Sequence, residues 1–264
     1  MGVIRTDKWL IDWYDKPIKI CEQVKAYFHN VKPLEIYEYF ILHGMYRPPF
    51  KKENEWVKKL QNNKVWDVVT KEKQYLEETW GGPDIPIFIF PSDPHNRDLK
   101  QNYNGKSGLA FKDKLFLFLS DDNKQKEIRA LFTHEYNHVC WLAKYKKNEK
   151  DYVLLDTVIL EGLAENAVRE RFGEEYTANW TTYYSNQTLK KLWDTLVFPN
   201  RNILPSDRKH QDILYGFRFY PKMAGYCVGY YLVKKYMLEN SLICKDLLHS
   251  QTDLFHQIKN YHIF

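Results

Sequence analysis

The chain has 264 residues, which suffices for one large domain or for a core with a helical extension. Apolar residues make up 44% and charged residues 28%, so the composition argues against a disordered chain. The net charge of +5 is spread along the sequence, which favours a solvated surface over nucleic-acid binding. No apolar run approaches the roughly 20 residues that a membrane-spanning helix needs.

The four cysteines, Cys21, Cys140, Cys227 and Cys244, lie far apart and form no Cys-x-x-Cys pair. The first residues also lack the continuous apolar core of a signal peptide. We therefore expect a cytoplasmic protein whose cysteines are reduced.

Helices are predicted through most of the first 80 residues, because apolar side chains recur there at helical spacing. Gly81-Gly82-Pro83 interrupts this pattern, and the β-branched and aromatic run Ile85–Phe90 predicts a buried strand that stops at Pro91. A hairpin is predicted from Ser107–Phe111 and Leu115–Leu119. These breaks suggest a helical region at residues 1–82 and a core at residues 83–264, or else one continuous domain.

Long helices are predicted in the second half of the chain. Ser120–Asn123 supply good N-cap residues for the first of them. The second is expected to end at Gly173, since glycine commonly follows a helix C-terminus. The predicted helices cover about 124–145, 152–172, 174–196, 223–238 and 253–261, with a Pro- and Asn-bearing loop at 198–206.

The first of these helices carries His134-Glu135-Tyr136-Asn137-His138. Two histidines four residues apart project from the same side of a helix, so both imidazoles can bind one tetrahedral ion. Glu135 falls within the apolar stripe of this helix, where an ionised carboxylate is costly unless it is paired or used. The pattern therefore predicts a zinc site with Glu135 as general base.

Glu161 and Glu165 supply the remaining acidic groups, one turn apart on the following, mostly apolar helix. A catalytic zinc ion usually keeps three protein ligands and one open position. We predict Glu161 as the third ligand, with Glu165 accepting a hydrogen bond from the other ring nitrogen of a ligand histidine. The exchange of these two roles is the alternative.

At these residues the sequence resembles the gluzincin metallopeptidases, which carry HExxH on one helix and a ligand Glu on the next. More closely, it is similar to the YjaZ-like family of predicted Zn-dependent proteases. The features it shares with that family are HExxH, Glu161-Gly162-Leu163-Ala164-Glu165, and Gly225-Tyr226-Cys227-Val228-Gly229-Tyr230. The interval from His138 to Glu161 is slightly longer than in thermolysin-like peptidases.

The resemblance implies an α+β, mostly helical fold, whose zincin-like core packs a small sheet on the HExxH helix. It implies a zinc-dependent peptidase that acts on a peptide or protein substrate. A strand from the Leu115–Leu119 region is expected at the sheet edge, where an extended substrate could pair with it.

In the mechanism implied, a zinc-bound water gives its proton to Glu135 and attacks the peptide carbonyl. Tyr226 is the preferred donor to the resulting oxyanion, with Tyr230, Tyr215 and His210 as rivals. Two other functions stay open at this point. One is a zinc-stabilised scaffold that binds a partner without cleaving it, and the other is a metal-dependent hydrolase of a non-peptide amide or ester.

Overall fold

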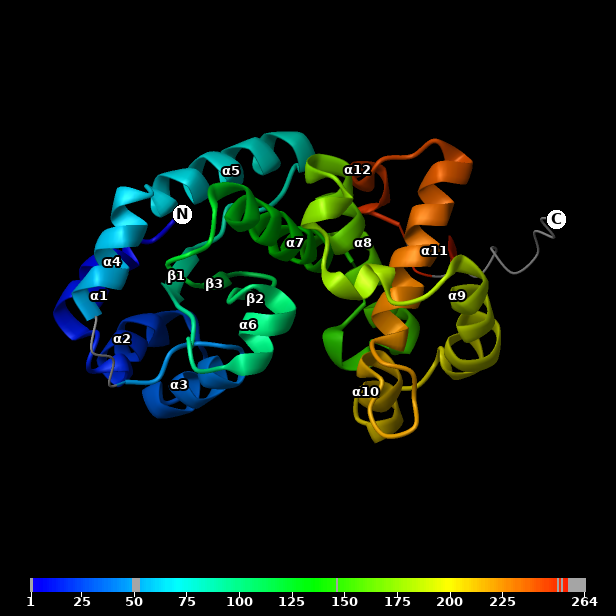
Figure 1. The fold of residues 1–264 in the computed structure, drawn as a ribbon, viewed down its shortest axis with the longest axis horizontal. Coiled ribbons are helices and arrows are strands. Elements are labelled where there is room, and N and C mark those ends of the chain that lie inside the picture. Colours follow the sequence, from blue (N-terminus) through cyan, green and yellow to red (C-terminus); the bar gives the residue numbers. More distant parts are fainter. Residues whose placement is uncertain (1, 49–52, 146, 251, 253, 256–264) are drawn as a thin grey trace. The chain divides into compact units, whose positions relative to one another are not determined.

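Two compact units make up the chain, Met1–Val139 and Cys140–Phe264 (Figure 1). This computed structural model describes residues 2–48, 53–145, 147–250, 252 and 254–255. The boundary between the units falls within one helix, α7 (Gln125–Lys144). This division does not test whether residues 1–82 form a region of their own, so that boundary stays a prediction.

The described residues of the first unit contain one three-stranded sheet with the order β1-β3-β2. β1 (Ile87–Pro91) pairs parallel with β3 (Leu115–Leu119), and β2 (Ser107–Ala110) pairs antiparallel with it. The predicted hairpin is therefore confirmed. Every residue of β1 and β3 is buried, as their uninterrupted apolar sequences require.

The strand order corrects the expectation that the Leu115–Leu119 region lies at the sheet edge. β3 is the central strand, because β1 occupies one side of it and β2 the other. The outer side of β1 also receives backbone hydrogen bonds, such as the one that Ile4 N donates to Ile87 O at 2.8 Å. Among the described residues β2 pairs with β3 alone, so β2 provides the open edge of the sheet.

The predicted helices of the first 80 residues are present. They are α1 (Thr6–Trp13), α2 (Pro17–Val24), α3 (Pro33–Leu42), α4 (Glu53–Asn62) and α5 (Val65–Trp80). A short helix that the sequence pattern did not predict, α6 (Arg97–Tyr103), lies between β1 and β2. Its start is capped by Asn96, whose side chain accepts a hydrogen bond from Leu99 N at 3.0 Å.

Helix α7 agrees with the prediction to within a residue or two at each end. Two long-range hydrogen bonds hold it in the first unit: Arg129 Nε donates to Glu72 Oε2 of α5 at 2.6 Å, and Tyr136 donates its hydroxyl to Pro83 O at 2.9 Å. Tyr136 is fully buried. The α7 helix is thereby fixed on the same framework that carries the sheet.

The described part of the second unit contains helices joined by turns and loops, and no strand. Its helices are α8 (Leu154–Phe172), α9 (Asn186–Leu192), α10 (Arg208–Tyr215), α11 (Ala224–Asn240) and α12 (Cys244–Leu247). The predicted end of α8 at Gly173 is confirmed. The predicted helix near Asp253–Tyr261 falls mostly outside the described residues.

The prediction of one helix over residues 174–196 is wrong. Only α9 is an α-helix there, preceded by two 3₁₀ turns, Glu174–Tyr176 and Asn179–Thr182. The physical reason lies in polar side chains that bond to nearby backbone. Thr177 donates its hydroxyl to Glu174 O at 2.8 Å, and Ser185 accepts from Thr188 N at 3.2 Å as the N-cap of α9.

Helices α8 and α11 approach each other through two glycines. A Cβ atom on Gly229 would lie 2.0 Å from Val158 O, and one on Gly162 would lie 2.3 Å from Gly229 O. Neither position can carry a side chain without a shift of backbone. Gly162, which follows Glu161, and Gly229, three residues after Tyr226, therefore set the distance between these two helices.

The chain is thus mostly helical with a small sheet, compatible with the predicted α+β class. All four cysteines are buried and free, in agreement with the expectation that they form no disulfide. Within the described ranges, no helix is both long and apolar enough to cross a bilayer.

Candidate metal centre

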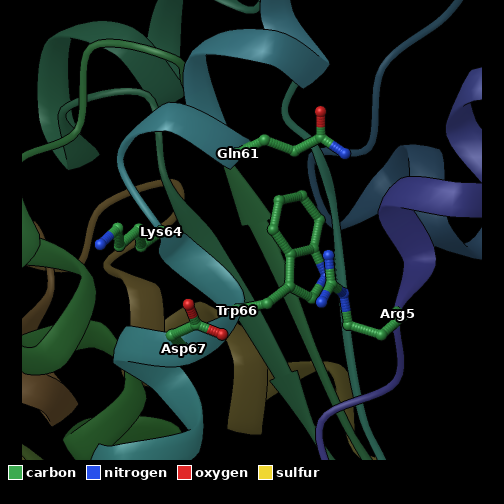
Figure 2. Close-up of a pocket in the computed structure, with 5 residues that line it drawn as sticks. All are labelled: Arg5, Gln61, Lys64, Trp66 and Asp67. Atoms are coloured by element: carbon green, nitrogen blue, oxygen red, sulfur yellow. The ribbon is translucent and has the colours of Figure 1, made fainter.

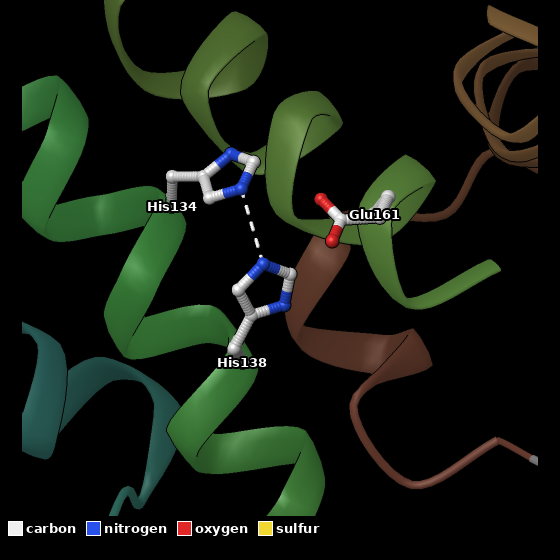
Figure 3. Close-up of side chains that lie close together, drawn as sticks. All are labelled: His134, His138 and Glu161. Carbon is white, nitrogen blue, oxygen red and sulfur yellow. Dashed lines mark hydrogen bonds between the residues drawn. The ribbon is translucent and has the colours of Figure 1, made fainter. Parts of the chain in front are cut away.

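The three predicted ligands lie together. His134 and His138 occupy successive turns of α7, and their Nε2 atoms are 3.1 Å apart. Glu161 of α8 turns its carboxylate toward this pair, and the three potential ligand atoms all lie within 4.8 Å of one another (Figure 3). His138 is buried with 8% of its surface exposed, while His134 and Glu161 are half-buried.

This arrangement fits a zinc ion. Zn–N bonds of about 2.0–2.1 Å at a tetrahedral angle place two ligand nitrogens about 3.3 Å apart. The Nε2 atoms of His134 and His138, at 3.1 Å, are close to that separation. Two imidazoles and one carboxylate are also the donor set of several catalytic zinc sites, in which a fourth position stays open.

Glu135 lies on α7 between the two histidines and is buried, with 8% of its surface exposed. Its side chain rests against Gly108 in the edge strand β2: a Cβ atom on Gly108 would lie 2.3 Å from Glu135 Cδ and 2.5 Å from its Oε1. The carboxylate therefore occupies the space that any other residue at position 108 would fill. Gly108 makes room for the group predicted to act as base.

Gly108 was not among the predicted site residues. A signal for it exists, since an isolated glycine within a strand often marks a close approach of other groups to the backbone. Nothing in the sequence, however, identifies Glu135 as the group that approaches. The contact between Gly108 and Glu135 depends on the fold, in which β2 pairs with β3 and Gly108 lies opposite Leu117.

Glu165 is nearly fully buried, with 4% of its surface exposed. Its Oε1 accepts a hydrogen bond from the backbone N–H of Ala178 at 2.5 Å. This contact fixes the carboxylate between α8 and the segment that follows it. The predicted bond from a ligand histidine to Glu165 stays a prediction.

Tyr226 lies in the first turn of α11 and donates its hydroxyl to the Tyr215 hydroxyl at 3.3 Å. Its ring packs edge-on against Trp180, with the ring centroids 5.3 Å apart. Burial raises the pKa of Tyr215, the hydrogen bond from Tyr226 opposes this, and the negative charge of Glu161 adds to the rise. The two tyrosines therefore form a hydrogen-bonded pair, and Tyr215 lies close enough to Glu161 to be affected by its charge.

His210, another predicted rival for the oxyanion donor, lies on α10 and is almost fully buried. Its Nε2 is 3.2 Å from Oγ1 of Thr157, which precedes Glu161 by one turn of α8. Burial lowers the pKa of His210, although Asp207 opposes the shift. The last rival, Tyr230, packs edge-on against Trp180 with ring centroids 6.3 Å apart.

A pocket of about 130 Å³ in the first unit contains none of the predicted site residues. It is lined by Arg5, Gln61, Lys64, Trp66 and Asp67 (Figure 2). Arg5 and Gln61 already donate hydrogen bonds to Asp7, at 2.6 Å and 2.8 Å, so these two polar groups of the pocket are engaged in the fold.

Comparisons with known proteins identify the family of the chain. The family model described as "Predicted Zn-dependent protease (DUF2268)" matches residues 65–256. The uncharacterized protein YjaZ of Bacillus subtilis (strain 168) is 44% identical over 213 residues, 81% of each chain. The uncharacterized protein YjfC of the same organism is 23% identical over 171 residues, 62% of this chain and 57% of its own. No solved structure matches.

The matched residues contain the whole His134, His138 and Glu161 group. Zinc is the cofactor that this family and this donor set indicate together. The chain belongs to the family of predicted Zn-dependent proteases, as the sequence resemblance implied.

Proposed function

We propose that this protein is a zinc peptidase that hydrolyses peptide bonds, with His134, His138 and Glu161 as the metal ligands. The observation that carries the proposal is the convergence of these three groups, with Glu135 buried on the same helix as the two histidines. Structural zinc sites usually close four protein ligands and need no base beside them. A three-ligand set with a neighbouring carboxylate favours catalysis over a non-catalytic scaffold.

Bound zinc would act as a Lewis acid that polarises the scissile carbonyl and lowers the pKa of water from 15.7 toward about 7. Glu135 would accept a proton from the attacking water and return it to the leaving amine, so that the residue ends in its starting state. Its burial against Gly108 holds the carboxylate in one place and removes it from bulk water. Both effects favour proton transfer at a fixed position.

Tyr226 is our proposed donor to the oxyanion that forms when water adds to the carbonyl. Its hydroxyl bond to Tyr215 is long at 3.3 Å, so the group can turn to a stronger acceptor at little cost. One such donor is worth roughly 10²- to 10³-fold in rate. Tyr215 would orient Tyr226 as its hydrogen-bond partner.

The open edge of β2 supports a peptide as the substrate. An extended peptide can add to an exposed strand through backbone hydrogen bonds. Because Gly108 of β2 lies against Glu135, a peptide paired with this strand would run past the base. This arrangement corresponds to the zincin-like core that we propose for the chain, and it favours a peptide over a non-peptide amide or ester.

We propose Glu165 as a supporting group that orients one of the ligand histidines. Its position, anchored to the Ala178 N–H and one turn from Glu161, suits such a role. We also propose a cytoplasmic location. Four buried free thiols are typical of proteins folded in a reducing compartment.

The test of the metal centre is the zinc content of purified protein, with single alanine substitutions at His134, His138 and Glu161. We expect about one zinc per chain and a severe loss of affinity in each variant, because only three protein ligands hold the ion. Glu165→Ala should cost less, about 10- to 100-fold. Zinc retained in all three ligand variants would refute the site. If Glu165→Ala lost zinc and Glu161→Ala retained it, Glu165 would be the ligand and Glu161 the supporting group.

A further inference from the structure

The loop between α10 and α11 displays two phenylalanines to solvent. We call residues 216–222, Gly-Phe-Arg-Phe-Tyr-Pro-Lys, the aromatic loop. Phe219 is completely exposed at 101% of its reference surface, and Phe217 is 54% exposed. Two exposed aromatic residues this close in the sequence are candidates for a binding surface.

The backbone of the aromatic loop is held by hydrogen bonds, so the points from which its phenylalanines project are defined. Phe217 N donates to Asp212 O at 2.9 Å, and Tyr220 N donates to Phe217 O at 3.2 Å. The backbone of Gly216 has a φ of +75°, and a Cβ atom there would lie 2.1 Å from Pro221 O. Arg218 adopts a φ of 60° and pairs with Asp212 at 3.4 Å. A strained, hydrogen-bonded loop of this kind favours a role for its outward side chains.

Within the second unit, the aromatic loop contacts the tyrosine pair that contains Tyr226, the proposed oxyanion donor. The rings of Phe217 and Tyr215 stack with their centroids 5.5 Å apart. Tyr215 in turn accepts the hydrogen bond of Tyr226, and the charge of Glu161 contributes to the raised pKa of Tyr215. A chain of three neighbouring aromatic residues therefore leads from the proposed oxyanion donor to the surface.

We propose that the aromatic loop binds a large apolar side chain of the peptide substrate. Cleavage would then favour bonds that have Phe, Tyr, Leu or Met within a few residues. This inference rests on the proposed peptidase function and adds the substrate class to it. Phe217 and Phe219 would act as specificity-determining residues, because burying an apolar side chain against them releases water from both partners.

The charges of the loop favour a peptide over an anionic membrane. Cations that are free to meet lipid headgroups strengthen the binding of an aromatic loop to an anionic membrane. Arg218 is already paired with Asp212, and the Lys222 ammonium lies 5.2 Å from the centre of the Tyr183 ring. Both cations of the loop are thus engaged within the protein.

The test compares wild type with Phe217→Ala and Phe219→Ala by two readouts. The first is the cleavage profile of the zinc-loaded proteins on a mixed peptide library, read by mass spectrometry. The second is binding of Glu135→Gln proteins, with and without each loop substitution, to arrays of peptides rich or poor in large apolar residues. Leu238→Ala is the matched control, since Leu238 is 66% exposed at the far end of α11, about 20 Å along that helix.

We expect wild type to prefer peptides with large apolar residues in both readouts. The KM of each phenylalanine variant for these peptides should rise about 10-fold, as the loss of part of an apolar pocket typically causes, while kcat should stay unchanged. Peptides without such residues, and the Leu238→Ala protein, should show no change. Both variants should fold, because the side chains removed are exposed.

Three results would overturn the inference. Cleavage without apolar preference would refute it and leave the proposed function standing. No cleavage by any zinc-loaded protein would refute the proposed function. The peptide array would then test the binding role of the aromatic loop separately, and equal binding of apolar and polar peptides would reject that role. Loss of binding to phosphatidylglycerol vesicles in Phe219→Ala, with an unchanged peptide profile, would assign the loop to membranes instead.

Discussion

Glycines lie beside the candidate site in two regions, and different groups occupy the space that a side chain would take at each. In the first unit, Gly108 of β2 leaves space for the Glu135 side chain. In the second unit, Gly162 and Gly229 leave space for backbone, at the crossing of α8 and α11. A side chain can rotate away from an added methyl group, whereas two helices must move apart.

Gly108 is therefore expected to matter for catalysis, and Gly229 for the packing of the fold. An added methyl at position 108 should displace one functional carboxylate and leave the fold nearly intact. An added methyl at position 229 should separate the helices that carry Glu161 and Tyr226. The same substitution, glycine to alanine, therefore predicts a catalytic defect in one region and a folding defect in the other.

Gly229→Ala should give the largest effect. Its new Cβ would lie 2.0 Å from Val158 O, which no rotamer can relieve. We expect a loss of unfolding free energy at the upper end of the about 1–3 kcal/mol that overpacking costs, measured by urea denaturation. Gly2→Ala is the control, because a Cβ at Gly2 meets nothing within 4 Å. Equal stability of the two variants would contradict the close crossing of α8 and α11.

Tyr226→Phe tests the chemistry that this crossing positions. It removes one hydroxyl and keeps the ring against Trp180, so zinc content and melting temperature should stay near wild type. We expect kcat to fall roughly 10²- to 10³-fold with little change in KM, since the donor acts mainly in the transition state. If Tyr215→Phe produced that loss and Tyr226→Phe did not, the roles of the two tyrosines would be exchanged.

Gly108→Ala should have the smallest effect of the three substitutions, because it displaces only the side chain of the proposed base Glu135. Zinc should be retained, while kcat falls about 10- to 100-fold because the Glu135 carboxylate is displaced from its position. A double-mutant cycle sharpens the test: Gly108→Ala should destabilise wild type but be nearly neutral in the Glu135→Ala background, where the space is empty. Additive changes in unfolding free energy would show that the two residues do not compete for space.

The features that the sequence predicted best are those that depend on apolar periodicity and on the residues that start and end helices and strands. Helix α7 follows from its N-cap residues and from a stretch without Gly or Pro, strand β3 follows from an uninterrupted apolar run, and the end of α8 follows from Gly173. The ligand histidines were predictable for the same reason, since a spacing of four residues fixes their side of the helix.

What the sequence could not predict depends on tertiary contacts. The order of strands placed β2 at the edge instead of β3, and no local pattern specifies which neighbour pairs with which strand. The helix predicted over residues 174–196 gave way to 3₁₀ turns, because Thr177 and Ser185 bond to backbone. The contact between Gly108 and Glu135 joins two elements whose meeting only the fold determines.

The most direct test of the central claim is the Glu135→Gln variant, measured on one peptide that the wild type cleaves. The amide keeps the shape of the side chain against Gly108 but cannot accept the proton of water. We predict wild-type zinc content, an equal or higher melting temperature because a buried charge is removed, and no detectable hydrolysis. Cleavage of that peptide at the wild-type rate by the zinc-loaded Gln variant would contradict the proposed mechanism.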